Sequence, residues 1–220
     1  IDQGYGLTES SLDDVITLGA ELLISVDCGV RDKILINKYV EEKKLDFVIT
    51  DHHQPPEDIA KDLNYILVHQ MYPGKEYPDR EICGTTIAFL LVQALKAEAG
   101  METIINENTN GLDLVALSTV ADMMPLVGVN RIFLSHGLKQ LQKGTRLGFI
   151  MLALRAGIEH KDTYKYHLGY VIGPRINAAG RIGSPLEAVK LLVSTDEKQC
   201  QEIAKDLNDV NFSRQKMTTD

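Results

Sequence analysis

Three consecutive residues that can bind metal or transfer protons, Asp51, His52 and His53, directly follow the apolar run 47–50. Neutral imidazole is a transition-metal ligand, and a neighbouring carboxylate can fix the tautomer of the ring. The alternative is a polar strand end that only caps a sheet. Two adjacent histidines behind an aspartate favour the metal site.

Asp27 is a second candidate ligand, because it ends the apolar run 22–26 and is followed by Cys28 and Gly29. Glycine at that position lets the backbone pass close to whatever the carboxylate holds. An aspartate at a strand end also often caps the next helix, so Asp27 taken alone leaves both interpretations open. We interpret Cys28 as a small buried hydrophobic residue rather than a ligand.

Asp122 follows a helical apolar pattern that includes Val115 and Thr119. Asp122 lies seven positions after Val115 and three after Thr119, so on a continuing helix its side chain would point toward the core. An unpaired carboxylate there would cost several kcal/mol, so we expect Asp122 to have a partner. A metal ion is the favoured partner, and an arginine is the alternative.

The segment 172–183 contains three glycines, two arginines and an asparagine in twelve positions. We expect a glycine-rich turn whose backbone N–H groups, together with Arg175 and Arg181, bind phosphate oxygens. The spacing does not match a dinucleotide fingerprint, and no Walker lysine follows. The alternative is a tight turn whose arginines are solvated or salt-bridged.

The elements that must position these residues begin with three short apolar runs separated by polar segments of helical character. This pattern predicts β-α-β-α-β, a parallel sheet covered by helices, with ligands at the carboxyl ends of its strands. The runs and the residues that follow them are 22–26 with Asp27, 47–50 with Asp51, and 65–68 with His69. We interpret His69 as a structural or surface histidine.

The rest of the chain is predicted to be helical. The expected features are a core-facing stripe of Ile87, Leu90, Leu91, Ala94 and Leu95, a helix over 112–120, two helices within 131–157, a capping box at Ser184 to Glu187, and a last helix from about Asp196. The predicted fold class is therefore α/β: a parallel sheet flanked by helices, followed by a helical part and a long connecting helix.

Composition limits the class of protein. The chain has 220 residues and a net charge of -8, which argues against coating nucleic acid by charge alone but permits a metal-assisted site. Three cysteines without a C-x-x-C pair argue against a disulfide scaffold or a structural zinc site and favour a reducing cytosol. Neither an apolar run of about 18 residues nor a signal peptide occurs, so we expect a cytoplasmic protein with no membrane contact.

Four sequence blocks, in this order and spacing, resemble the DHH phosphoesterases. They are residues 25–29 (SVDCG), 51–53 (DHH), 118–126 (STVADMMPL) and 173–181 (GPRINAAGR). Within that family, the chain is similar to bacterial exonucleases that degrade single-stranded DNA from the 5′ end. The resemblance covers essentially the whole chain and implies two Mn²⁺ or Mg²⁺ ions.

The resemblance also implies a role for each motif residue. Asp27 is implied to bridge both metal ions, His52 and Asp122 to be ligands of one of them, His53 to lie beside the scissile phosphate, and Asp51 to be the supporting carboxylate. The implied nucleic-acid-binding residues are Arg175, Asn177 and Arg181, which would line the path of the strand, with the two arginines on phosphates.

The expected function is metal-dependent 5′→3′ exonuclease activity on single-stranded DNA in recombination and repair, with single-strand-binding and recombination proteins as candidate partners. The alternatives are a DHH phosphodiesterase acting on short oligonucleotides or cyclic dinucleotides, and a non-catalytic DHH-like scaffold for nucleic acid or replication proteins. Residues 1–195 would be a DHH-type catalytic domain without its first motif, and residues 196–220 the start of a helix leading to an absent second domain. We therefore expect the 220-residue chain alone to be inactive.

Overall fold

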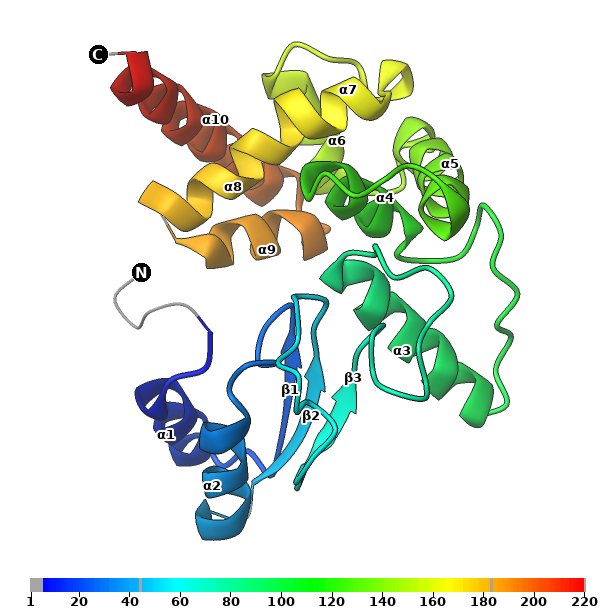
Figure 1. Cartoon of the computed structure of the whole chain (residues 1–220). Coiled ribbons are helices and arrows are strands. Elements are labelled where there is room, and N and C mark those ends of the chain that lie inside the picture. The colour runs from blue at the N-terminus through cyan, green and yellow to red at the C-terminus, as the bar shows by residue number, and fades with distance from the viewer. Residues whose placement is uncertain (1–5, 44, 183, 220) are drawn as a thin grey trace. The chain divides into compact units, whose positions relative to one another are not determined.

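The computed structural model describes residues 6–43, 45–182 and 184–219; the side chains of residues 43, 181–182 and 217–219 lie outside this description. The chain divides into two compact units, residues 1–103 and 104–220, each with its own hydrophobic core (Figure 1). This boundary lies inside the domain predicted over residues 1–195. Among the described helices, none is both long enough and apolar enough to span a bilayer.

The first unit is built on a parallel sheet of three strands in the order β1-β2-β3, as predicted. The strands are β1 (Leu22–Val26), β2 (Asp46–Thr50) and β3 (Ile66–Val68). The last residues of the three strands, Val26, Thr50 and Val68, stand in register. The residues that follow them therefore leave the sheet at one carboxyl edge, which confirms the predicted alignment of Asp27, Asp51 and His69.

Three helices accompany this sheet: α1 (Glu9–Thr17), α2 (Lys33–Lys43) and α3 (Gly84–Glu98). In Figure 1, α1 and α2 lie on one side of the sheet and α3 on the other. The side chains of Leu12, Ile36, Tyr39, Phe47 and Ile49 form the buried core between α1, α2 and β2. Burial of these apolar surfaces fixes the sheet, and with it the carboxyl edge.

One expectation for the first unit is wrong. Residues 51–65, between β2 and β3, form turns instead of the predicted helix, and Pro55 and Pro56 lie within this segment. Proline lacks the N–H that a helix interior needs and restricts the residue before it to extended conformations. Separately, the side chains of Leu22, Ile24 and Val26 on β1 are exposed.

Helix α3 forms where expected, but its buried face differs from the prediction. The buried residues are Gly84, Thr86, Ile87, Phe89 and Gln93. Of the predicted stripe, only Ile87 is fully buried, and Leu95 is exposed. The other three residues of the stripe, Leu90, Leu91 and Ala94, line a shallow hollow with Tyr77 and Pro78. The N-terminal glycine of this helix, Gly84, packs closely against Asp27.

The second unit is helical, as predicted. Its elements are α4 (Leu112–Ala121), α5 (Gly128–Lys143), α6 (Leu147–Arg155), η1 (His160–Asp162), α7 (Lys165–His167), η2 (Leu168–Ile172), α8 (Gly173–Ile182), α9 (Pro185–Val193) and α10 (Glu197–Thr219). Helix α10 begins at the expected position, and its Cys200, Ile203, Ala204 and Leu207 belong to the core of this unit. Helix α9 begins at Pro185, but the Ser184 side chain makes no capping hydrogen bond.

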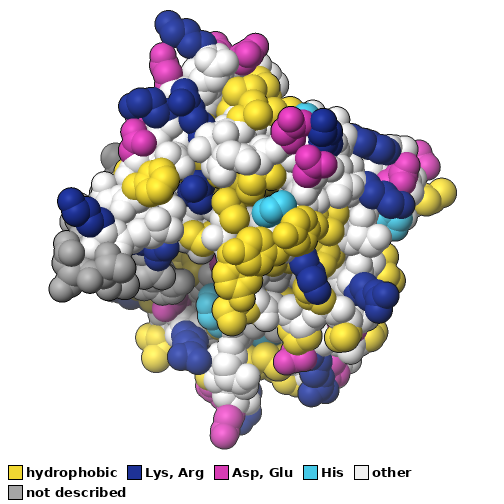
Figure 2. Space-filling view, turned by 90° about the horizontal axis from the view of Figure 1, so that it is seen from above, with side chains coloured by type: hydrophobic (Ala, Val, Ile, Leu, Met, Phe, Trp, Pro, Cys, Tyr) yellow, Lys and Arg dark blue, Asp and Glu magenta, His cyan; other side chains and the backbone are white. Residues whose placement is uncertain are grey.

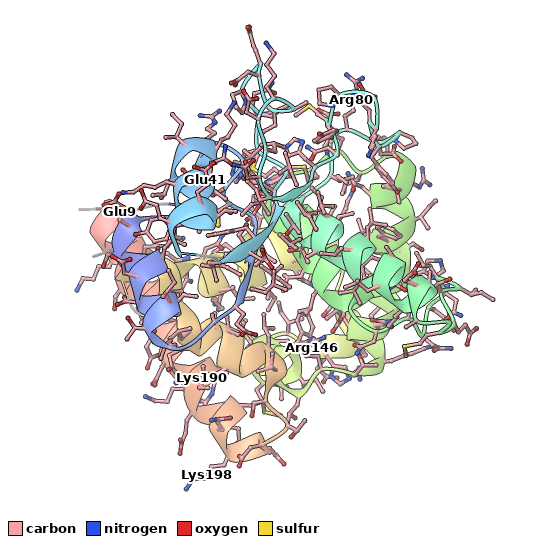
Figure 3. All side chains as sticks on the ribbon, turned by 90° about the horizontal axis from the view of Figure 1, so that it is seen from below. Glu9, Glu41, Arg80, Arg146, Lys190 and Lys198 are labelled. Carbon is pink, nitrogen blue, oxygen red and sulfur yellow. The ribbon has the colours of Figure 1, made fainter. Side chains whose placement is uncertain are left out.

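A buried ion pair ties four helices of the second unit together. Arg146, labelled in Figure 3, is the N-cap residue of α6, and its guanidinium pairs with the Asp113 carboxylate at the start of α4. The same guanidinium donates to the carbonyl of Leu192 in α9. Gln140 of α5 accepts a hydrogen bond from the Asp113 N–H at 3.1 Å. Each buried polar atom in this group therefore has a partner, which is the condition for tolerating a charge inside a core.

Candidate metal centre

Asp27, His52 and His53 meet at the carboxyl edge of the sheet in the first unit. One potential ligand atom from each residue lies within 4.8 Å of the other two, and among the described residues this is the one group of three such side chains. Parallel strands bring together residues that are 25 positions apart in the chain, because Val26 and Thr50 are paired. Two of the four sequence blocks, residues 25–29 and 51–53, thus meet in space.

Asp27 adopts an unusual backbone conformation, with φ at 65°. Left-handed backbone is costly for a residue with a side chain and is commonly retained at functional sites. Gly84 makes this conformation possible, because a Cβ at Gly84 would lie 2.3 Å from Asp27 Oδ1 and 2.8 Å from its Cβ and Cγ. The glycine at the start of α3 therefore lets the Asp27 carboxylate approach the first turn of that helix.

His52 is oriented by a backbone carbonyl. Its Nδ1 lies 3.0 Å from the Ile82 carbonyl oxygen, which can only accept, so Nδ1 carries the proton. In the neutral ring Nε2 then presents a lone pair toward Asp27 Oδ1, 3.1 Å away. At this distance the contact is satisfied either by a proton on Nε2, which would make the ring an imidazolium, or by a metal cation bound to both atoms. Adjacent ligands of an octahedral ion with bonds of about 2.1 Å are separated by about 3 Å, so this donor pair fits a divalent metal.

His53 is oriented by the carboxylate of Asp51. Its Nδ1 lies 2.7 Å from Asp51 Oδ1, and the same carboxylate accepts from the backbone N–H groups of Val30, His52 and His53. Burial alone would raise the pKa of Asp51, but these hydrogen bonds outweigh it and hold the pKa below its ordinary value. The ionised Asp51 thus keeps the His53 proton on Nδ1 and leaves Nε2 as an acceptor.

Two residues after β3, which sequence reasoning did not assign to the site, hold the backbone of both histidines. His69 Nδ1 accepts from the Met71 N–H, so its Nε2–H donates to the His53 carbonyl at 2.9 Å. Burial lowers the pKa of His69, consistent with a neutral ring. Gln70 donates to the His52 carbonyl at 2.8 Å. The sequence signal was present, since His69 follows the third strand as Asp27 and Asp51 follow the first two.

Asp122 is not buried as expected. It is the exposed C-cap of α4, with its N–H donating to the Ser118 carbonyl at 2.8 Å. The helix ends one residue earlier than the extrapolated pattern required, so the side chain never turns into the core. Asp122 belongs to the second unit, and its role as a metal ligand stays a prediction.

The expected glycine-rich turn over 172–183 is also wrong, because residues 173–182 form α8. Arg175 is buried there: its Nε donates to Asn208 Oδ1 at 3.1 Å, its Nη1 to the Val171 carbonyl at 2.7 Å, and burial lowers its pKa. Its guanidinium therefore fastens α8 to α10 and lends no support to the predicted phosphate contact. Asn177 is exposed on α8, and the Arg181 side chain lies outside the described residues. Both remain predicted contacts to nucleic acid.

Comparison with known proteins agrees with this geometry. Residues 4–119, which contain the sheet and the histidine pair, match the model of the DHH family, N-terminal domain. The chain is 36% identical to the single-stranded-DNA-specific exonuclease RecJ of Bacillus subtilis over 99% of this chain and 26% of that protein. It is 35% identical to the RecJ of Haemophilus influenzae over 98% of this chain and 38% of that protein. The chain thus spans well under half of each relative.

Solved structures give the same result for the fold. A crystal structure of exonuclease RecJ bound to manganese superposes with a TM-score of 0.83 at 28% identity, covering 97% of this chain and 52% of that one. RecJ of Thermus thermophilus in complex with Mn²⁺ superposes with a TM-score of 0.78 at 28% identity, over 92% of this chain and 30% of that one. Asp27 and the histidine pair are clustered at the sheet edge, and the family model matches more than half of this chain. The chain therefore belongs to the DHH family.

Proposed function

We propose that this chain supplies part of the catalytic core of a metal-dependent exonuclease that hydrolyses single-stranded DNA from its 5′ end. The observation that carries the proposal is the Asp27, His52 and His53 cluster, in which the His52 Nε2 lone pair faces the Asp27 carboxylate at 3.1 Å. The relatives named single-stranded-DNA-specific exonuclease, and the solved structures that hold Mn²⁺ or Mg²⁺, support the same reaction.

Asp27 Oδ1 and His52 Nε2 are the atoms that would hold a divalent cation, Mn²⁺ or Mg²⁺. When bound, such a cation polarises a phosphoryl oxygen and lowers the pKa of a bound water. Asp27 supplies the negative charge, and the Ile82 carbonyl keeps the His52 ring in the tautomer that exposes Nε2. A second cation is part of the proposal, and Asp27 and Asp122 are the residues that would supply further ligands for the pair.

His53 has a separate task in the proposed reaction. With its proton held on Nδ1 by Asp51, its exposed Nε2 can accept a proton from water or a hydrogen bond from a protonated group. The Asp51 carboxylate also stabilises the imidazolium that forms when Nε2 accepts that proton. His69 and Gln70 keep the backbone of both histidines in place while this happens.

The alternative functions have less support. A phosphodiesterase of short or cyclic nucleotides would use the same metal centre, but the relatives matched over nearly the whole chain carry the exonuclease name. A non-catalytic scaffold would have no need for an aspartate in left-handed backbone facing a histidine lone pair. Single-strand-binding and recombination proteins remain proposed partners.

The natural polypeptide that contains this chain is the right material for the test. With Mn²⁺, it should shorten a single strand from the 5′ end and leave a duplex intact. Asp27→Ala should reduce the rate by several orders of magnitude, whereas Asp46→Ala, at the opposite end of the same sheet, should not. Equal rates in wild type and Asp27→Ala would contradict the proposal.

A further inference from the structure

The second unit exposes a ladder of three tyrosines. Tyr164, Tyr166 and Tyr170 are 53%, 52% and 75% exposed. The rings of Tyr164 and Tyr166 stack with centroids 6.1 Å apart and planes 24° apart, and those of Tyr166 and Tyr170 at 5.1 Å and 25°. Figure 2, which views the molecule from above, shows a continuous band of hydrophobic side chains with a basic side chain against it. Each of the three tyrosines thus keeps more than half of its surface exposed to solvent.

The backbone places this ladder beside the end of α4. Residues 168–172 form a π-helical turn, a rare feature that is frequent at functional sites. Within it, Gly169 packs on α4 so closely that a Cβ would lie 3.1 Å from Val120 Cγ1. The four-residue spacing of Tyr166 and Tyr170 keeps both rings on one side of the helical segment. The ladder is therefore fixed against the last turn of α4.

A hollow of about 460 Å³ lies between the ladder and α4. The side chains that matter for its chemistry are Met123, Met124, Lys165, Tyr166 and Tyr170. Lys165 is the one charged side chain among its lining residues, on a chain whose net charge is -8. Met123 is held outward in left-handed backbone, with φ at 57° and 86% of its surface exposed.

The hollow adjoins the predicted metal ligand of this unit. Asp122 lies in the chain between Ala121 and Met123, both of which line the hollow. A strand bound at Asp122 would therefore pass residues that line the hollow. Unpaired bases have flat faces that stack on aromatic rings, and their phosphates pair with a cationic side chain such as Lys165.

We propose that the ladder and hollow formed by Tyr164, Tyr166, Tyr170, Met123 and Lys165 are a stacking platform for unpaired bases of single-stranded DNA. This inference rests on the proposed function, because it places the platform next to Asp122. A hydrophobic protein partner could also occupy an apolar hollow, but the single cationic lining residue and the run of stacked rings favour nucleic acid.

Intrinsic tyrosine fluorescence gives a direct test, since the chain contains eight tyrosines and no tryptophan. A short oligothymidylate is added to the chain without divalent metal, so binding is measured separately from hydrolysis. Base stacking should quench the tyrosine emission, and an abasic oligonucleotide of equal length should quench it far less. Fluorescence anisotropy of labelled oligonucleotides gives the affinities.

Tyr170→Leu should weaken binding of oligothymidylate about tenfold, because stacking on one ring is worth about 1–3 kcal/mol. Tyr170→Phe, which keeps the ring, should bind as wild type does. The affinity for the abasic oligonucleotide should be the same in all three proteins. Leu186→Ala removes an exposed apolar side chain of α9 outside the hollow and serves as the control.

Unchanged affinity and quenching in Tyr170→Leu would overturn the platform and return the hollow to a protein-docking interpretation. An equal loss for the abasic strand would also overturn it, because the ring would then not act on bases. Neither result bears on hydrolysis. Conversely, a natural polypeptide that shows quenching but leaves single strands uncut with Mn²⁺ would contradict the proposed function alone.

Discussion

Replacing Gly84 by alanine tests how closely Asp27 must be held. The new Cβ would lie 2.3 Å from Asp27 Oδ1 and 2.8 Å from its Cβ and Cγ, whereas ordinary contacts begin at 3.4 Å. Rotation of the side chain cannot relieve the clash, because the Asp27 Cβ is itself too close. The carboxylate must therefore move by about 1 Å, a displacement that can cost about 10²-fold in rate when it affects a positioned group.

The effect on stability should be small by comparison. Overpacking costs about 1–3 kcal/mol, and the better helix propensity of alanine returns up to about 1 kcal/mol. The rate of hydrolysis by the natural polypeptide and the Mn²⁺ affinity measured by titration calorimetry should both fall. The free energy of unfolding, measured in urea, should change by less than about 2 kcal/mol. Gly180→Ala is the control for metal binding, since a Cβ there meets nothing within 4 Å. Wild-type metal affinity and rate in Gly84→Ala would refute the role of this close approach.

Three further outcomes follow from other contacts. Gln70→Met removes the hydrogen bond to the His52 carbonyl and should weaken Mn²⁺ binding by about tenfold with little change in melting temperature; an unchanged calorimetric affinity would contradict this. Arg146→Met leaves the Asp113 carboxylate buried without its partner and should lower the free energy of unfolding in urea by about 3–5 kcal/mol. Adding Asp113→Asn removes the unpaired charge and should restore part of that stability. Burial raises the pKa of Tyr65 to about 12, so the unfolded chain loses that proton first and stability should fall as the pH rises above about 10. Tyr65→Phe should flatten this alkaline loss, and identical pH profiles of unfolding would contradict it.

The sequence predicted the sheet and the residues at its edge because both depend on local patterns. Short apolar runs ending in Asp27, Asp51 and His69 needed only the parallel register to bring their side chains to one edge. Two contacts were not predictable: the close approach of Gly84 to Asp27, and the hydrogen bond between His52 Nδ1 and the Ile82 carbonyl. The first depends on a missing Cβ and the second on a backbone carbonyl, and neither leaves a pattern in the sequence of side chains. The three-dimensional approach of α3 to Asp27 decides both.

The predictions that proved wrong concern the end of helix α4 and the segment that forms helix α8. Asp122 was extrapolated from apolar spacing, but α4 ends at Ala121 and leaves the side chain exposed. The segment around Arg175 reads as a glycine-rich turn, yet tertiary packing against α10 makes it helical and buries the guanidinium. Propensity is a weak guide where packing can override it.

We propose that the His52 ring holds a divalent cation beside the Asp27 carboxylate. Pulsed electron paramagnetic resonance of bound Mn²⁺ tests it directly, because a coordinated imidazole nitrogen modulates the echo. The structure predicts a nitrogen modulation in the wild-type chain that disappears in His52→Leu and persists in His136→Leu, a histidine of the second unit. A spectrum of Mn²⁺ surrounded by oxygen ligands alone in the wild type would contradict the account.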